Sequence, residues 1–287
     1  MLAITGATGQ LGRLVIEVLL QKVPASQIVA VVRDVHKAQD LAKLGVQVRY
    51  ADYTQPDSWC EAFAGVNKVL LISSSEVGQR VEQHRTVIEA AKAANVTLLA
   101  YTSILNADRS SLMLAEEHVA TEALIQESGL PAVILRNGWY SENYTMGIPA
   151  ILKQGMMIGC VGDGRISSAP RRDYAEAAAD VLTREGQAGK VYELAGDHGF
   201  TLAEFADYLS EATGQSIAYQ NLSEADYVHA LESAGVPEPL PMVLGNSEIG
   251  ASAGDLFSTS IDLSQLLGRP STPIGVTIKE TLSGITE

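Results

Sequence analysis

Short apolar runs alternate, through the first half of the chain, with stretches in which apolar residues recur every three or four positions. The runs predict strands over 2–5, 28–32, 46–50, 69–72, 98–102 and 132–136. The stretches between them predict helices over 11–21, 35–44, 57–63, 79–94 and 115–127. Strands that are apolar at nearly every position are typical of a parallel sheet buried by helices on both faces. The order of elements therefore predicts an α/β fold with a doubly wound parallel sheet.

The alternation changes after residue 140. Residues 191–195 predict one more strand, a candidate further member of the same sheet. Helix N-terminal capping patterns then begin helices at Thr201 and Ser223. We therefore expect two parts, a sheet domain over residues 1–140 and a smaller, mostly helical part over residues 141–287.

Three glycines follow the first expected strand, where residues 4–12 read Ile-Thr-Gly-Ala-Thr-Gly-Gln-Leu-Gly. In this context Gly6 permits a tight turn, Gly9 removes a Cβ where backbone approaches a pyrophosphate, and Gly12 lets the helix pack close to the sheet. The helix N-terminus adds N–H groups and a partial positive charge. We therefore predict a Rossmann-like dinucleotide site, the alternative being a purely structural turn. Its expected contacts are Gly6, Ala7, Thr8, Gly9, Gln10, Leu11 and Gly12.

Arg33 directly follows the expected strand over 28–32. An acidic residue at this position binds the ribose 2′-hydroxyl of NAD, whereas an arginine pairs with the 2′-phosphate of NADP. Lys37 adds positive charge one helical turn on, and Asp34 is a candidate helix cap. We favour the phosphate-binding role, with a solvated arginine as the alternative.

Polar residues also follow three other expected strands. Asp52 is a candidate partner of the adenine, or else a turn-forming aspartate. The small residues Ser73, Ser74 and Ser75 allow backbone to approach the cofactor, or else form an ordinary loop. The segment Asn137–Tyr144 is rich in aromatic, amide and carboxylate groups. We expect this segment to close over a nicotinamide and to form a flat side of the pocket for an aromatic substrate. The alternative is a hydrophobic joint between the two parts of the chain. The two roles are compatible.

Candidate acid–base groups are few. None of the ten tyrosines has a lysine four residues later, so the Tyr-x-x-x-Lys pair of ordinary short-chain dehydrogenases is absent and their alcohol oxidation is disfavoured. His118, on the helix after the fifth expected strand, is a candidate proton donor, with a structural role as the alternative. Tyr140 is a second candidate, on the expected acceptor side.

Composition excludes several classes of function. The net charge of −14 disfavours binding to nucleic acid and to anionic membranes. Cys60 and Cys160 are the only cysteines, and without a Cys-x-x-Cys pattern or Cys/His cluster we expect neither zinc nor a disulfide scaffold. The first expected strand begins at residue 2 and the apolar runs are short, so we expect no signal peptide or membrane span and a cytoplasmic location.

These features together resemble the NmrA-like atypical short-chain dehydrogenases, and most closely their bacterial type-2 NAD(P)H:quinone oxidoreductase group. The resemblance covers almost the whole chain. Its most specific segments are Leu70–Arg80, Leu135–Tyr144, Val191–Asp197, Gln220–Asp226 and Leu267–Pro270.

The resemblance implies NADPH bound by the glycine loop, Arg33 and Ser73–Ser75, together with Asn137, Gly138, Trp139, Tyr140, Ser141 and Glu142. It implies reduction of a small quinone, beside which we place Asn143 and Tyr144. We expect no flavin, because there is no second nucleotide motif, and no metal. The alternatives are an NADP(H)-binding redox sensor of NmrA type and a reductase of other conjugated electrophiles such as dyes. The resemblance does not settle the role of His118, and a homo-oligomer stays open.

Overall fold

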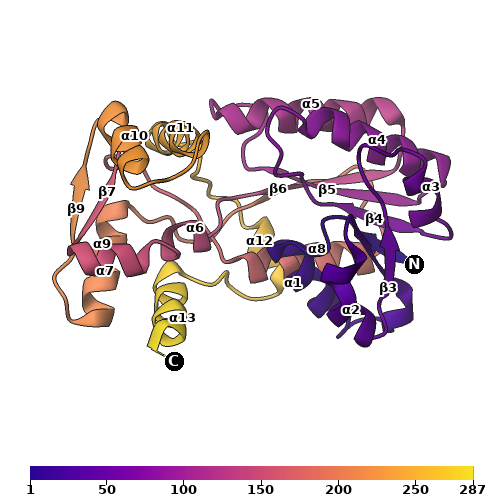
Figure 1. The fold of residues 1–287 in the computed structure, drawn as a ribbon, viewed down its shortest axis with the longest axis horizontal. Coiled ribbons are helices and arrows are strands. Elements are labelled where there is room, and N and C mark those ends of the chain that lie inside the picture. Colours follow the sequence, from indigo (N-terminus) through magenta and orange to yellow (C-terminus); the bar gives the residue numbers. More distant parts are fainter. Residues whose placement is uncertain (287) are drawn as a thin grey trace.

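A seven-stranded parallel sheet forms the framework of the protein, whose computed structural model describes residues 1–286 and side chains up to residue 285 (Figure 1). The strand order is β3-β2-β1-β4-β5-β6-β8, and every neighbouring pair is parallel. The doubly wound α/β prediction is therefore confirmed. The strands are β1 (Leu2–Ile4), β2 (Ile28–Val32), β3 (Gln47–Tyr50), β4 (Lys68–Leu71), β5 (Leu98–Ile104), β6 (Ala132–Asn137) and β8 (Val191–Leu194).

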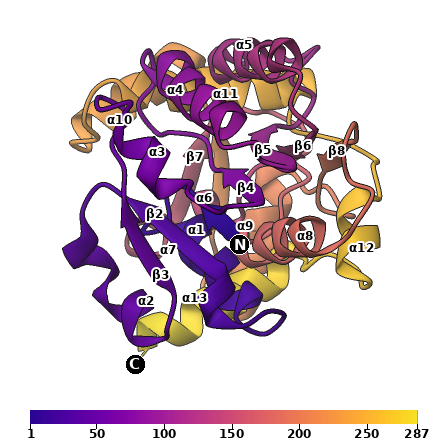
Figure 2. The same cartoon turned by 90° about the vertical axis from the view of Figure 1, so that its right-hand side faces the viewer.

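Helices cover both faces of this sheet, because successive strand residues point to opposite sides and the residues on both sides are apolar. In β2, Ala30 belongs to the apolar core on one face, while Val29 and Val31 belong to the core on the other. Figures 1 and 2 show α4 and α5 on one side of the sheet and α1 and α8 on the other. The first layer holds α3 (Ser58–Ala62), α4 (Arg80–Ala93) and α5 (Met113–Ser128); the second holds α1 (Gln10–Leu19), α2 (Gln39–Lys43), α8 (Arg171–Thr183) and α12 (Asp262–Leu267).

The second part of the molecule is smaller and has its own apolar core. It contains a two-stranded parallel sheet of β7 and β9, on the left of Figure 1. The predicted capping box at Thr201 is confirmed, since its hydroxyl accepts the N–H of Glu204 and the Glu204 carboxylate accepts the N–H of Thr201. The elements here are α6 (Glu142–Thr145), α7 (Ile148–Gln154), β7 (Met156–Gly159), α9 (Leu202–Thr213), β9 (Ala218–Asn221), α10 (Glu224–Ser233), α11 (Leu240–Ala253) and α13 (Ile274–Thr286).

The path of the chain between the two parts is less simple than a division at residue 140. After β7 the chain returns to the large sheet, where α8 packs in the same core as α1. β8 then pairs with β6 at the edge of the sheet, as expected of the strand over 191–195. The segment over residues 171–194 thus completes the sheet layer, although it lies in the second part of the sequence.

Two segments differ from the predicted elements. The expected helix over 35–44 is a 3₁₀ turn, η2 (Val35–Ala38), followed by the short α2; a second 3₁₀ turn, η1 (Ala25–Gln27), precedes β2. The sequence analysis predicts no helix over residues 240–253, where the structure has α11, which begins at Leu240. The sequence of α11 lacks a clear apolar stripe because it packs partly through glycines, with Gly250 against Leu112.

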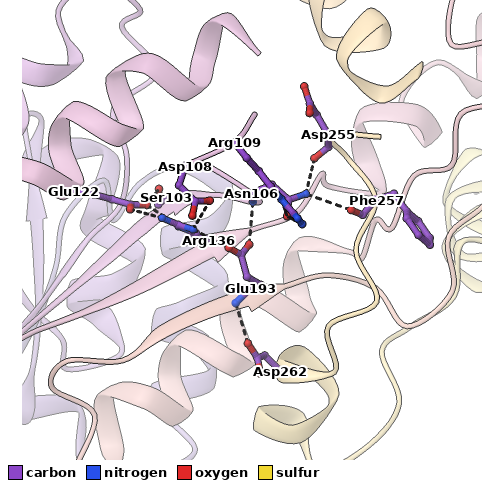
Figure 3. A network of polar contacts seen from close by, with 10 residues as sticks. All are labelled: Ser103, Asn106, Asp108, Arg109, Glu122, Arg136, Glu193, Asp255, Phe257 and Asp262. Atoms are coloured by element: carbon purple, nitrogen blue, oxygen red, sulfur yellow. Dashed lines mark hydrogen bonds and ion pairs between the residues drawn. The ribbon is translucent and has the colours of Figure 1, made fainter. Parts of the chain in front are cut away.

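A network of charged side chains joins β5, α5, β6 and β8 (Figure 3). Arg136 is 11% exposed and lies at its centre. Its guanidinium donates to Glu122 at 2.8 and 3.0 Å, to Glu193 at 2.9 Å and to Asp108 at 2.9 Å. Ser103 donates to Glu122 at 2.6 Å. One half-buried cation therefore offsets the charge of two half-buried glutamates.

The same network reaches the C-terminal segment. The backbone N–H of Asn106 donates to Glu193 at 2.9 Å, and the amide of Asn106 donates to the carbonyl oxygens of Asp255 and Phe257. The backbone N–H of Glu193 in turn donates to Asp262 at 2.9 Å. Figure 3 shows these contacts as a continuous chain between the strands and the last third of the sequence.

Candidate functional site

The glycine turn between β1 and α1 exposes backbone N–H groups. Gly6 has φ +58°, a conformation that favours glycine, and its carbonyl accepts the N–H of Gly9 at 2.9 Å. Gly9 is the N-cap of α1 and provides no side-chain hydrogen bond to the first turn. The N–H groups of that turn are therefore available to an anion.

Gly9 and Gly12 are needed for different reasons. A Cβ on Gly12 would clash with the carbonyl oxygen of Gly6 and lie 2.9 Å from the Cα of Ala7. Gly12 is thus required for α1 to pack against its own turn. A Cβ on Gly9 would meet only the Gly6 oxygen, at 3.1 Å. On its outer side Gly9 lines the cavity described next.

A cavity of about 710 Å³ lies where β1, β2 and β4 end, above this turn. It brings together the glycine loop, the residue after β2 and the serines after β4, which are far apart in the sequence. This is the carboxyl edge of the sheet, where open α/β folds bind their ligands. The predicted site residues that line it are Gly6, Thr8, Gly9, Gln10, Leu11, Gly12, Arg33, Ser73, Ser74, Ser75 and Tyr140.

Four cationic side chains line the cavity although the chain as a whole is acidic: Arg33, Lys37, Arg80 and Arg171. Arg33 is 62% exposed. Asp34, next to it, accepts the N–H of His36 at 2.9 Å and caps η2. Two acidic side chains, Asp34 and Glu76, also line the cavity, so the lining carries more cationic than anionic groups on a protein of net charge −14.

Arg171 is one of several cavity residues, with Tyr53, Glu76 and Arg80, that the sequence analysis did not identify. Its guanidinium carbon lies 4.3 Å from the centre of the Tyr140 ring, a cation–π contact. It also pairs with Glu142 at 3.4 Å and donates to Asn143 at 3.2 Å. Glu142 and Asn143 do not line the cavity; they hold Arg171 there. Arg171 is the first residue of α8, and no local motif marks it.

Asn137 ends β6 beside Tyr140. Its side-chain nitrogen lies 3.5 Å from the Tyr140 hydroxyl, and its side-chain oxygen is buried without a hydrogen-bond partner among the described residues. A buried acceptor left unpaired costs free energy. Asn137 itself does not line the cavity, so this unpaired oxygen lies inside the protein, close to Tyr140, which does.

The rest of the segment after β6 forms the joint between the two parts. Gly138 donates to the carbonyl of Leu194 at 2.7 Å, and Ser141 shares a hydrogen bond with Ser168 at 2.8 Å. Trp139 and Tyr144 pack against the core of the second part, where the Tyr144 ring lies 5.7 Å from that of Phe200. The structure thus shows the joint between the two parts, whereas Gly138, Trp139, Ser141 and Tyr144 do not line the cavity and Tyr140 does.

Asp52 and Ala7 lie outside the cavity lining. The Asp52 carboxylate accepts the N–H of Thr54 at 2.8 Å and its hydroxyl at 2.7 Å, and these bonds lower the pKa of Asp52. This is the turn-forming role. The neighbouring Ala51 and Tyr53 line the cavity instead. Ala7 is buried beneath the turn.

The loop after β4 is held by buried side chains of α4. The N–H of Ser74 donates to His84 at 3.0 Å, and Arg80 donates to the carbonyl of Ser74 at 2.7 Å. Burial lowers the pKa of His84 to about 3, so its ring is neutral and accepts this bond. The backbone of Ser74 is therefore fixed on both sides.

His118 is buried in α5 and does not line the cavity. Its ring nitrogen lies 2.7 Å from the Tyr101 hydroxyl. Burial, with smaller contributions from Arg80 and His84, lowers the pKa of His118 to about 3. A general acid must carry its proton at the working pH, and His118 is neutral well above pH 3. These contacts favour the structural alternative.

Other types of site find no support within residues 1–286. No group of three or more histidine, cysteine, aspartate or glutamate side chains in this range is arranged to hold a metal ion. No helix in the described part of the chain combines the length and hydropathy needed to cross a membrane. Cys60 and Cys160 are free, the first exposed and the second buried.

Comparison with known proteins gives consistent results. A family model described as NAD(P)H-binding matches residues 6–185. Quinone oxidoreductase 2 of Escherichia coli is 55% identical over 278 residues, 97% of each chain. The crystal structure of the E. coli NADPH-dependent quinone oxidoreductase complexed with NADPH has a TM-score of 0.97 and 54% identity, covering 98% of this chain and 100% of the other. Triphenylmethane reductase of Citrobacter sp., complexed with NADP(H), has a TM-score of 0.95 and 42% identity, covering 98% and 100%.

Proposed function

The chain belongs to the NAD(P)H-binding family, and from this premise we propose that it is an NADPH-dependent reductase of quinones. One observation carries the proposal. The glycine turn, Arg33 and Ser73–Ser75 line a single cavity in a chain that is 55% identical to a quinone oxidoreductase. The function is therefore argued from a site as well as from a likeness.

The residues present fit NADPH. The uncapped first turn of α1 suits the pyrophosphate, and Arg33 suits the 2′-phosphate. Asn137 does not line the cavity, but it lies next to Tyr140, which does, and we propose that its unpaired side-chain oxygen accepts a hydrogen bond from the nicotinamide carboxamide. When bound, NADPH supplies a hydride from its nicotinamide ring.

The protein contributes mainly by positioning. Hydride transfer requires donor and acceptor atoms about 3–3.5 Å apart, and correct alignment supplies much of the rate. The Ser73–Ser75 loop is held by α4, and Tyr140 is held between Tyr174 and Arg171. Both walls of the site are therefore pre-organised.

A quinone places small demands on acid catalysis. It is activated by its own conjugation, and reduction makes its ring aromatic, so the product anion is stabilised. A buried, neutral His118 is compatible with that chemistry. We propose that the step uses no flavin, because the sequence carries a single nucleotide motif, and no metal, because it carries no Cys-x-x-Cys pattern or Cys/His cluster.

The decisive experiment follows the loss of NADPH absorbance with small benzoquinones and naphthoquinones. Purified protein is expected to be colourless and to turn over these acceptors. NADPH deuterated at the transferred position should give a primary isotope effect when chemistry limits the rate. Protein that binds NADPH but never oxidises it would favour the alternative function of a redox sensor.

The second candidate function is reduction of cationic dyes. It is favoured by the 42% identity to the triphenylmethane reductase and by the negative net charge, which attracts cations. Parallel assays with a triphenylmethane dye and a quinone would rank the two. A kcat/KM that is higher for the dye would replace the quinone as the preferred substrate class.

We further propose separate roles for the two parts of the chain, the class of its partners and its cellular location. Residues 1–140, completed by α8 and β8, bind the cofactor, and residues 141–287 contribute most of the substrate side. The partners are small molecules rather than nucleic acid, given the net charge. We place the protein in the cytoplasm, since its two cysteines are unpaired. Size-exclusion chromatography with light scattering would give the oligomeric state.

Substituting Gly9 with valine is expected to weaken NADPH binding about 100-fold or more, the equivalent of losing one or two charge-assisted hydrogen bonds. The added side chain would stand where the pyrophosphate is proposed to bind, whereas inside the protein its Cβ makes one tight contact, 3.1 Å from the Gly6 oxygen. Calorimetric titration measures the loss. Gly284→Val, where nothing lies within 4 Å, is the matched control. A folded Gly9→Val protein with unchanged affinity would make the loop a structural turn only.

Tyr140→Ala should lower kcat about tenfold while changing NADPH affinity less, because this ring forms a wall of the cavity. Tyr140→Phe separates the ring from the hydroxyl. Burial raises the pKa of Tyr140, so the phenol keeps its proton at neutral pH. A rate within about twofold of wild type for Tyr140→Phe is expected of a positioning role. A loss of about 10²-fold would instead identify the hydroxyl as the proton donor.

Tyr144→Ala serves as the comparison on the substrate side. Tyr144 packs against Phe200 and Phe205 rather than lining the cavity. Its removal should therefore lower turnover indirectly, by loosening the joint between the two parts. For Tyr144→Ala we expect a lower midpoint of thermal unfolding together with a lower kcat. A drop in kcat at unchanged thermal midpoint would place Tyr144 against the substrate.

A further inference from the structure

Arg33 already has an anionic partner within the protein. Its guanidinium donates to the carboxylate of Glu76 at 3.1 Å, and both side chains line the cavity. Arg33 follows β2 and Glu76 lies in the loop after β4, the two strands that flank β1. The ion pair therefore joins the strand ends on either side of the glycine turn.

Glu76 is held in place from behind. Its second carboxylate oxygen accepts the side-chain N–H of Gln83, on α4, at 2.7 Å. Its backbone N–H donates to the hydroxyl of Ser74 at 3.2 Å, and that hydroxyl in turn donates to Gln83. Glu76 is thus a positioned carboxylate beside the cavity, although its side chain is 43% exposed.

We propose that Glu76 is a specificity-determining residue that competes with the 2′-phosphate of NADPH for Arg33. This rests on the proposed function, in which Arg33 binds that phosphate. The pair is exposed, and such ion pairs are weak and readily exchanged. A phosphate dianion accepts stronger hydrogen bonds from a guanidinium than a carboxylate does. NADH has no such group, so it binds without breaking the pair.

The proposal gives Glu76 an unusual effect on affinity. When Arg33 exchanges Glu76 for the 2′-phosphate, the Glu76 carboxylate stays bound to Gln83 and therefore remains close to the phosphate. Both the lost ion pair and the remaining repulsion oppose the 2′-phosphate. Glu76 therefore lowers the affinity for NADPH and restrains the preference over NADH that Arg33 creates.

The test is Glu76→Gln, which keeps the shape of the side chain and removes its charge. Calorimetric titration with NADPH, 2′,5′-ADP and NADH should show about two- to fivefold tighter binding of the first two and no change for NADH. Glu82→Gln removes the same charge from an exposed residue of α4 paired with Arg85, and should change none of the three.

Other outcomes would overturn the proposal. Weaker binding of all three nucleotides would make Glu76 a direct ligand of a part that they share. Equal gains in affinity for NADPH and NADH would show that Glu76 acts only through the overall charge of the site and not through the 2′-phosphate. Wild-type protein that is folded by circular dichroism but binds no nucleotide would refute the proposed function itself, and so is distinguishable from these results.

A double substitution isolates the exchange at Arg33. In an Arg33→Ala background no guanidinium is left to compete for, so the gain from Glu76→Gln with 2′,5′-ADP should shrink toward one. A gain of unchanged size in that background would show that Glu76 acts without Arg33 and would contradict the competition.

Discussion

Replacing Arg136 with leucine is expected to lower the free energy of unfolding by about 3 kcal/mol, the lower end of the range for removing one partner of a buried ion pair. Glu122 and Glu193 are 16% and 27% exposed, and each would lose its cation. Leucine restores apolar contact but leaves the two carboxylates facing each other. Urea unfolding followed by far-UV circular dichroism measures the change.

Two further variants test the physical reason. Adding Glu122→Gln to Arg136→Leu should recover part of the loss, because it removes one of the unpaired charges. Arg85→Leu is the control, since Arg85 is 43% exposed and pairs with Glu82 on the surface of α4; it should change stability by less than about 1 kcal/mol. An Arg136→Leu protein as stable as wild type would mean that the network adds nothing to stability.

Replacing Arg33 with alanine is expected to weaken NADPH binding by about 1.5–3 kcal/mol, the range for a hydrogen bond to a charged group, which is about 10- to 150-fold. NADH binding should hardly change, because it lacks the 2′-phosphate. Fluorescence titration with both cofactors measures the two affinities in the same protein.

The comparison within one variant is what makes this informative. Arg33 is exposed, so its loss should leave the fold intact and allow binding to be measured directly. Arg85→Ala removes an equally charged surface residue away from the cavity and is the control. Equal losses for NADPH and NADH would refute the assignment of Arg33 to the 2′-phosphate.

The predicted residues that line the cavity carried local signals in the sequence. The spacing of Gly6, Gly9 and Gly12 directly encodes a turn and a helix start, and Arg33 stands at the end of an apolar strand. The strands were found because burial on both faces demands apolar residues at every position. Helix boundaries were close for α4, where the structure begins at Arg80 and ends at Ala93.

What the sequence could not predict depends on contacts between distant segments. Arg171 enters the cavity because α8, far along the chain, packs against α1. The apolar positions of α8 are largely alanines, whose periodicity is weak. Arg33 and Glu76 are 43 residues apart in the sequence, and no pattern in the sequence around either residue predicts their ion pair. The burial of His118 likewise depends on how α5 packs on the sheet.

The return of the chain to the large sheet has a consequence for folding. β6 pairs with β8 only after the whole of α6, α7, β7 and α8 has been made, so the edge of the sheet closes through contacts of high sequence separation. Such closure is entropically costly and slows folding. A fragment that ended near residue 140 would leave β6 as an open edge strand and the α1 face uncovered, which favours aggregation. The two parts are therefore expected to fold as one cooperative unit rather than as separable modules.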